Sequence, residues 1–210
     1  MLLQALETEL GGVEVYNTAI RCARNQDLKK EWSEYLDQTE HHVEVVHGIF
    51  EALGLDTEQT SPGREIVRAK GKSLVSAMEK ALAEAPESAQ ILAAECVVDA
   101  ETKDHMNWQL IGAVSQIATG EAKKALKEAY DEVEDEEDEH LYHSKGWCRE
   151  LWLDSLGFEA KLPPPEEEKD VKTARGEAQT EERRKAALKK SARKVSRGAP
   201  GRSRVTQRSV

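Results

Sequence analysis

The sequence predicts an all-α protein, an antiparallel four-helix bundle with a long crossover between its second and third helices and a disordered C-terminal tail. Apolar residues recur at alternating steps of three and four along four long segments, the pattern of helices packed in a bundle. Aromatic residues make up only 5% of the chain, and glycine and proline are scarce before Leu162, which disfavours a sandwich or barrel. About 32 residues separate the second and third segments, too many for a bundle loop but suited to a crossover.

The first helix is expected from Leu2 to about Arg24, and the second begins just after it. Asn25-Gln26-Asp27 breaks the first pattern and offers Asp27 as the N-cap of the second helix, which Gly54 ends. The inward row of the first helix is Leu2, Leu6, Glu9, Val13, Tyr16, Ile20 and Ala23. The inward row of the second is Leu28, Trp32, Tyr35, Thr39, His42, Val46, Ile49 and Leu53.

The crossover, residues 56–87, contains a Ser-Pro-Gly turn at 61–63 and an amphipathic stretch near residues 74–82. The third and fourth helices follow, joined by a turn at Thr119-Gly120, and the last helical pattern fades near Gly157. The inward row of the third helix is Ile91, Ala94, Val98, Glu101, His105, Trp108 and Gly112. The inward row of the fourth is Leu126, Tyr130, Val133, Glu137, His140, Trp147 and Leu151.

Charge is divided unevenly between the body of the chain and its end. The net charge is −10, yet residues 170–210 hold 13 Lys or Arg against 4 Asp or Glu, which leaves 17 against 36 in the rest. The apolar pattern stops at Pro163, so we expect a bundle over residues 1–162 and a Pro/Glu linker with a basic, disordered tail over 163–210. The tail suits non-specific binding to nucleic-acid phosphates. The alternative is a solubilising tail, or one that folds back on the acidic body.

The sequence favours a cytoplasmic protein without a membrane span. No run approaches 18 apolar residues, and the start lacks a basic segment followed by an apolar core and a cleavage site. Cys22, Cys96 and Cys148 are odd in number and isolated in helical patterns, so we expect three unpaired, buried thiols in a reducing compartment.

Six ionisable residues fall on the inward rows, where an ordinary core has none. They are Glu9, His42, Glu101, His105, Glu137 and His140. Burying such groups among apolar side chains costs several kcal/mol each unless a partner charge is present. A Glu-x-x-His pair on one helix face, as at Glu137 and His140, is the spacing that lets two side chains bind one metal ion.

These residues are also expected at one depth in the bundle. In a helical hairpin, residues equidistant from the turn lie at the same level. Glu9 and His42 are equidistant from the first turn, and Glu101 and Glu137 from Thr119 in the second. Each pair lies about 25 Å from its own turn, so the pairs meet near mid-bundle if the turns lie at opposite ends.

The chain resembles the ferritin-like superfamily over about Leu2 to Leu156, and within it the YciE/YciF-type stress proteins. The carriers of the resemblance are Glu9, the stretch 27–43, the crossover, Glu101 followed by His105, and Glu137-Asp-Glu-His140. The resemblance implies a ferritin-like bundle with a di-metal carboxylate site and chemistry with oxygen or peroxide.

One position departs from the superfamily pattern. That pattern would have Glu-x-x-His on the second helix, where the inward register here has Thr39-x-x-His42. Glu40 borders the inner face and is the candidate to replace the missing carboxylate, whereas Glu44-x-x-His47 is expected on the surface. The expected metal ligands, for one or two Fe or Mn ions per chain, are Glu9, Glu40, His42, Glu101, His105, Glu137 and His140.

Two functions remain open at this point. The first is a di-iron or di-manganese oxidoreductase that consumes peroxide or oxidises Fe(II) in stress protection. The alternative is a non-catalytic, stress-associated bundle with a degenerate metal site, which acts through its basic tail on nucleic acid or a partner protein. The sequence leaves the metal, the substrate and the formation of a homodimer undecided.

Overall fold

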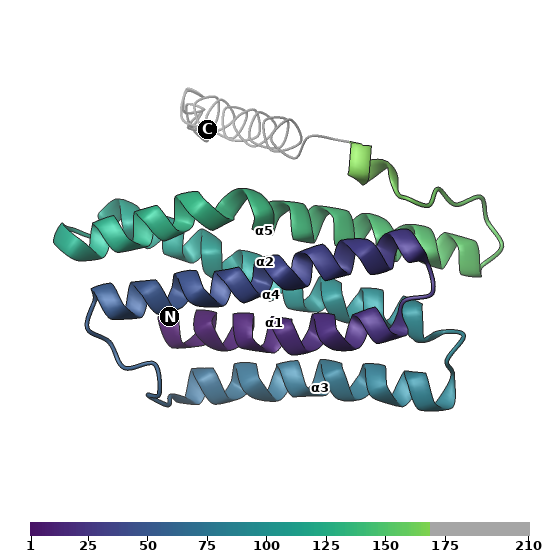
Figure 1. The fold of residues 1–210 in the computed structure, drawn as a ribbon, viewed down its shortest axis with the longest axis horizontal. Helices are drawn as coiled ribbons and strands as arrows, with labels where there is room; N and C mark the ends of the chain where they lie inside the picture. The colour runs from purple at the N-terminus through teal and green to yellow at the C-terminus, as the bar shows by residue number, and fades with distance from the viewer. Residues whose placement is uncertain (169–210) are drawn as a thin grey trace, which may run out of the picture. The chain divides into compact units, whose positions relative to one another are not determined.

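The computed structural model describes residues 1–168, which form five α-helices and one short 3-10 helix, with no β-strand among them (Figure 1). The elements are α1 Leu2–Cys22, α2 Gln26–Ala52, α3 Pro62–Glu84, α4 Ala89–Ile117, α5 Gly120–Ser155 and η1 Pro165–Glu168. The all-α prediction is confirmed. The predicted linker is in part the helix η1, which contacts α5. The predicted basic tail, with its proposed nucleic-acid contact, lies outside the described residues.

Short polar side chains and glycines mark the helix ends. Asn25 caps α2, because its side chain accepts hydrogen bonds from the backbone N–H groups of Asp27 at 2.9 Å and Leu28 at 3.2 Å. The prediction that Asp27 is the cap is therefore wrong by two residues. Asp27 lies in the first turn of α2, where its negative charge interacts favourably with the helix dipole. Gly54 follows the end of α2 with a φ of 61°, the left-handed conformation that glycine adopts without strain.

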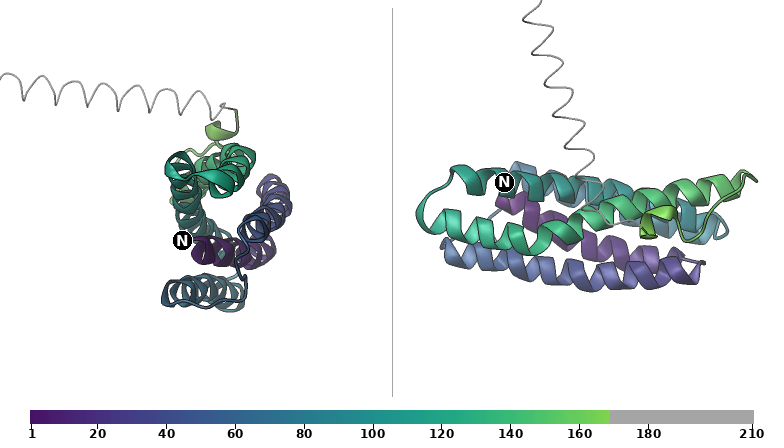
Figure 2. Two further views of the ribbon diagram at one scale, coloured as in Figure 1. Left: turned by 90° about the vertical axis from the view of Figure 1, so that its left-hand side faces the viewer. Right: turned by 90° about the horizontal axis from the view of Figure 1, so that it is seen from above.

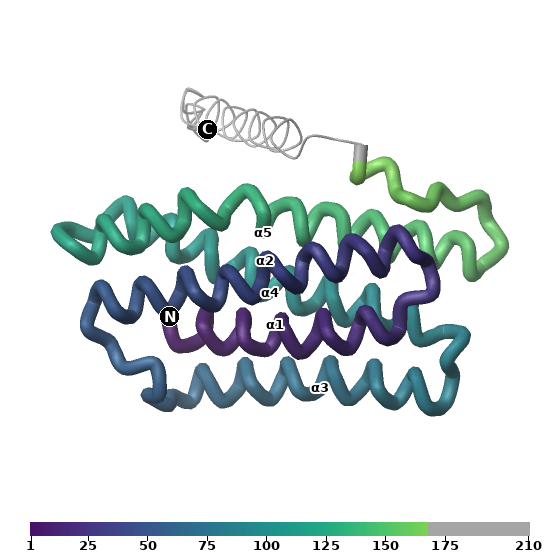
Figure 3. Tube along the Cα trace, viewed as in Figure 1, coloured from purple at the N-terminus to yellow at the C-terminus, as the bar shows by residue number. Residues whose placement is uncertain are grey.

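Four of the helices surround a common interior. α1 and α5 run in one direction and α2 and α4 in the other, and α1 and α5 each contact both α2 and α4 (Figures 1 and 2). The turn between α1 and α2 lies at one end of these helices and the turn between α4 and α5 at the other (Figure 3). The segment predicted as a crossover is mostly the helix α3, which packs on α1 and α4.

Ion pairs and small residues hold α3 against α1. Glu7 accepts hydrogen bonds from Arg64 Nε at 2.8 Å and from Arg68 Nε at 2.7 Å. Burial alone would raise the pKa of the Glu7 carboxyl, but the bonds from the two guanidinium groups lower it. Gly11 and Gly71 face each other, and the absence of side chains there lets the two backbones approach closely.

The apolar core consists of two clusters, one on each side of a polar layer. The first includes Tyr16, Trp32, Val97 and Trp147, and the second includes Leu6, Val46, Trp108 and Val133. In every one of the four surrounding helices, the sequence passes from one cluster to the other across a buried ionisable residue. The layer therefore crosses the whole interior.

Other predictions about the core can be checked directly. Cys22 and Cys96 are buried free thiols, as predicted, while the free thiol of Cys148 is only half-buried. Among residues 1–168, no helix is both long enough and apolar enough to cross a membrane.

Gly112→Ala is expected to destabilise the protein by about 1–3 kcal/mol, because a Cβ there would lie 2.6 Å from the Tyr130 ring. Gly48→Ala is the matched control, since Gly48 lies in the exposed interior of α2 with open space around it. This control should gain about 0.5–1 kcal/mol. Urea unfolding followed by circular dichroism measures both, and equal stability of the two variants would contradict the packing described here.

Candidate metal centre

Five of the seven predicted metal-site residues meet in the interior. They are Glu9 of α1, His42 of α2, Glu101 of α4, and Glu137 and His140 of α5. The most accessible of them, Glu101, is only 4% exposed. The residues that are equidistant from the two turns therefore do lie at one depth, as predicted.

The five residues form two groups of three that share Glu137. Glu9, His42 and Glu137 form one group, and Glu101, Glu137 and His140 form the other. Within each group, one possible ligand atom from every residue lies within 4.8 Å of the others. Nδ1 of His42 lies 2.9 Å from Oε1 of Glu137, and Nδ1 of His140 lies 4.0 Å from the same oxygen.

Both histidines are anchored through their Nε2 atoms. Nε2 of His42 lies 2.8 Å from Oε2 of Glu136, and Nε2 of His140 lies 2.8 Å from Oε1 of Gln38. A carboxylate and an amide oxygen accept hydrogen bonds, so Nε2 donates in each ring. Burial and the neighbouring His140 lower the pKa of His42 to about 4, which leaves its ring neutral. The Nδ1 atoms of both rings are buried, form no hydrogen bond of acceptable geometry, and face the carboxylates of the layer.

The carboxylates are anchored in the same way. The indole N–H of Trp108 donates to Oε1 of Glu9, and the hydroxyl of Tyr16 donates to Oε1 of Glu101, each at 2.7 Å. The Oε2 atoms of Glu9, Glu101 and Glu137 are buried without a hydrogen-bond partner. Each of the five residues therefore has one oxygen or nitrogen atom that is buried in the layer without a hydrogen-bond partner.

Asp104 is a buried member of the layer that the sequence interpretation missed. It is 5% exposed, and its Oδ1 has no hydrogen-bond partner. Burial and the charge of Glu101 raise the pKa of Asp104 to about 8. Burial and the charge of Asp104 likewise raise the pKa values of both Glu9 and Glu137. With a pKa of about 8, Asp104 holds its proton at neutral pH in the absence of a metal ion.

Two predicted ligands lie outside the layer. Glu40 is exposed, so it does not replace the carboxylate missing at Thr39, contrary to the prediction. Two residues along a helix correspond to a rotation of about 200°, which turns Glu40 away from the face of His42. His105 is half-buried between α4 and α5, with Nδ1 2.8 Å from Oδ1 of Asp138. The inward row of α4 passes through Asp104, three residues after Glu101, and not through His105, four residues after it. Both steps stay near one helix face, so the spacing did not decide between them.

The anchoring partners had weak or no sequence signals. Gln38 precedes His42 by four residues and so lies on a similar face of α2. Glu136 stands beside Glu137 in an acidic run, and nothing in that run predicts its bond to a histidine of another helix. Tyr16 and Trp108 were expected only as core.

A divalent cation fits this donor set. Unpartnered buried oxygen and nitrogen atoms are rare, because each costs about 1–3 kcal/mol. Here such atoms converge from four helices, and carboxylates with imidazoles are ligands of iron, manganese and zinc. The residues of the layer could therefore hold one or two ions.

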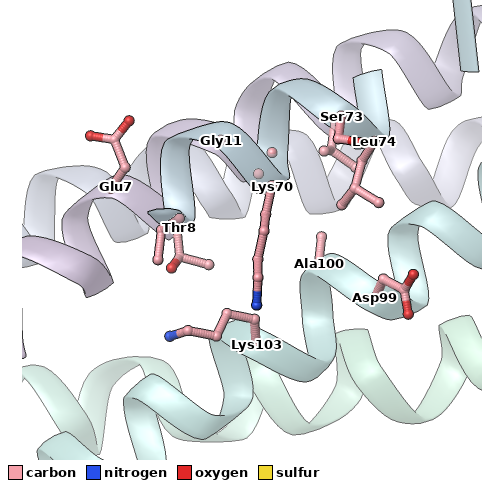
Figure 4. A pocket seen from close by; sticks show the side chains of 13 residues that line it. Glu7, Thr8, Gly11, Lys70, Ser73, Leu74, Asp99, Ala100 and Lys103 are labelled. Carbon is pink, nitrogen blue, oxygen red and sulfur yellow. The ribbon is translucent and has the colours of Figure 1, made fainter. Parts of the chain in front are cut away.

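A separate cavity of about 380 Å³ lies between α1, α3 and α4 (Figure 4). Its lining contains small residues such as Gly11 and Ala100 together with the ammonium groups of Lys70 and Lys103. None of the seven predicted metal-site residues lines it. The carboxylates of Glu7 and Asp99 also line it and offset the charge of the two lysines, so this cavity and the buried layer are separate features.

Comparison of the chain with protein-family models, with curated proteins and with solved structures gives no match. Function therefore rests on the chemistry of the site.

The raised acid pKa values predict that the metal-free protein loses stability as pH rises from 6.5 to 8. In this window folded Asp104 keeps its proton, while the unfolded chain has released it. The decline is up to about 1.4 kcal/mol per pH unit for each proton held. His42 acts in the opposite direction only below pH 6.5, where the unfolded histidine binds a proton.

Asp104→Asn should flatten this decline, because it removes one of the titrating acids. Asp37→Asn, an exposed change on α2, is the control and should keep the full slope. Urea unfolding at several pH values in the presence of a chelator gives the slopes. Identical slopes for the wild type and Asp104→Asn would contradict the assignment.

Proposed function

We propose that the chain is a ferritin-like bundle whose polar layer binds one or two Fe or Mn ions and reacts with peroxide or oxygen, or oxidises Fe(II), in stress protection. The observation that carries the proposal is the paired anchoring of the ligands. In Glu9, His42, Glu101 and His140, one polar atom is hydrogen-bonded outside the group and the other is buried without a hydrogen-bond partner. Metal-binding histidines and carboxylates are oriented in this way.

Glu137 supports a site for two ions. It belongs to both groups, and each group has one further glutamate and one histidine. A carboxylate has two oxygens and can bridge two metal ions, as in carboxylate sites within helical bundles. Zinc commonly needs only four ligands, whereas a carboxylate-rich pair of sites favours redox metals.

When bound, Fe or Mn would supply electron exchange with oxygen species at coordination positions that the protein leaves open. The described residues hold the ligands and manage protons. Tyr16 keeps its hydroxyl proton toward Oε1 of Glu101, because burial and the Glu101 charge raise its pKa. Asp104, with a pKa of about 8, holds a proton that ion binding in the layer would displace, and the pKa values of Glu9 and Glu137 are raised in the same direction.

Reconstitution of the full chain with Fe(II) or Mn(II) without oxygen is expected to load the central layer with about one to two ions per chain. Glu137→Gln should lower this content by at least about half, because Glu137 serves both groups. Glu128→Gln, an exposed change on the same helix, should leave the content unchanged. Metal analysis after desalting measures the content.

The same three proteins test the activity. Fe(II) oxidation and peroxide consumption should follow metal content, being retained in Glu128→Gln and lost in Glu137→Gln. Absence of bound Fe and Mn after reconstitution of the wild type would overturn the metal site. Full metal content without turnover would overturn the oxidoreductase and leave a binding protein.

Tyr16→Phe is expected to weaken metal binding about 10–100-fold, because it removes only the hydroxyl that orients Glu101. Tyr142→Phe, a half-buried position of α5, is the matched control and should bind as the wild type does. Competition with a metal-sensitive dye gives the affinities. Equal affinity of both variants would show that the anchor does not act on the ligand.

A further inference from the structure

A second group of histidine and carboxylate side chains lies outside the central layer. Glu31 of α2, His143 of α5 and Glu167 of η1 each offer one ligand atom, and these atoms lie within 4.8 Å of one another. None of the three was among the predicted ligands. The group joins two helices to the segment that follows α5.

One indole holds the two carboxylates beside each other. The N–H of Trp147 donates to Oε2 of Glu31 at 2.6 Å and to Oε1 of Glu167 at 2.9 Å. Each carboxylate keeps a second oxygen, and Oε1 of Glu31 is buried without a hydrogen-bond partner. In the part of the chain that the structure describes, no lysine or arginine forms an ion pair with either carboxylate. Two carboxylates this close need a positive charge or a proton between them.

His143 completes the group. It is 5% exposed, its Nδ1 lies 3.5 Å from Oε2 of Glu167, and its Nε2 is buried without a hydrogen-bond partner. The hydroxyl of Tyr35 lies 2.9 Å from the same Nδ1. A proton shared by Glu31 and Glu167 would bridge two oxygens, but it would leave Nε2 of His143 buried without a partner.

We propose that Glu31, His143 and Glu167 bind a single divalent transition-metal ion, and that this ion fastens residues 162–168 to α2 and α5. One imidazole and two carboxylates are a donor set for Zn²⁺, Mn²⁺ or Fe²⁺. The site goes beyond the proposed function, because it shares no ligand with the central layer. Burial and the charge of Glu167 raise the pKa of Glu31 to about 8, so ion binding releases a proton there.

The ring of Tyr35 lies between the two centres. It packs against His140 with ring centroids 4.1 Å apart, while its hydroxyl contacts His143. The aromatic ring separates the two sets of ligands and orients the imidazole of the second.

The test counts Zn²⁺ ions bound to the full chain after desalting. The double variant Glu31→Gln with His143→Gln should bind one ion per chain fewer than the wild type. Glu34→Gln with His47→Gln changes the same residue types at exposed positions of α2 and should lose none. Glu167→Gln, which alters no helix of the core, should also lose one ion, and circular dichroism verifies the fold of every variant.

Hydrogen exchange gives an independent readout. Zn²⁺ should slow exchange of the backbone N–H groups of Leu162, Glu166 and Glu167 in the wild type and in Glu137→Gln, but not in Glu167→Gln, since residues 163–165 are prolines without an N–H. Loss of ions only in Glu137→Gln would overturn this site and leave the central one. Loss only in the Glu31, His143 and Glu167 variants would support this site and count against the central one. Unchanged exchange on addition of Zn²⁺ would overturn the fastening role.

Discussion

The structure depends on keeping a layer of ionisable groups in a dry interior. Every helix around that interior contributes at least one acid or imidazole, and each such group costs several kcal/mol to bury without compensation. Burial and mutual repulsion raise the pKa values of Glu9, Asp104 and Glu137, which favours the neutral forms of these acids in the metal-free protein. Such a layer adds less stability than apolar side chains of similar size, so stability alone does not explain its presence.

The aromatic residues link the apolar clusters to this layer. Buried tyrosine and tryptophan need partners for their polar atoms, and here Tyr16 and Trp108 find them in the ligand candidates. The same bond therefore satisfies the aromatic group and orients the carboxylate. His42 and His140 are oriented from the partly exposed side instead, by Glu136 and Gln38. Orientation is thus supplied from both the core and the surface, which is why the layer can keep its inward atoms free.

Helical class and the depth of the layer could be predicted from the sequence, because periodicity and hairpin symmetry depend on chain geometry alone. Glu9 and His42 are equidistant from the first turn, and in the structure Nδ1 of His42 lies 3.9 Å from Oε2 of Glu9. The choice between Asp104 and His105 could not be made, since steps of three and four both stay near one face. Partners such as Glu136 depend on rotations of neighbouring helices, which a single sequence does not specify.

α5 shows how one spacing can serve two centres. Each step of three residues along an α-helix rises about 4.5 Å and rotates the side chain back by about 60°. Glu137 and His140 are one such step apart and both reach the central layer. A second step brings the chain to His143, by then about 9 Å along the axis and about 120° from Glu137. That position faces α2 and η1, where Glu31 and Glu167 lie. A three-residue repeat on a helix of 3.6 residues per turn drifts around the helix axis, so its third member faces other partners than its first.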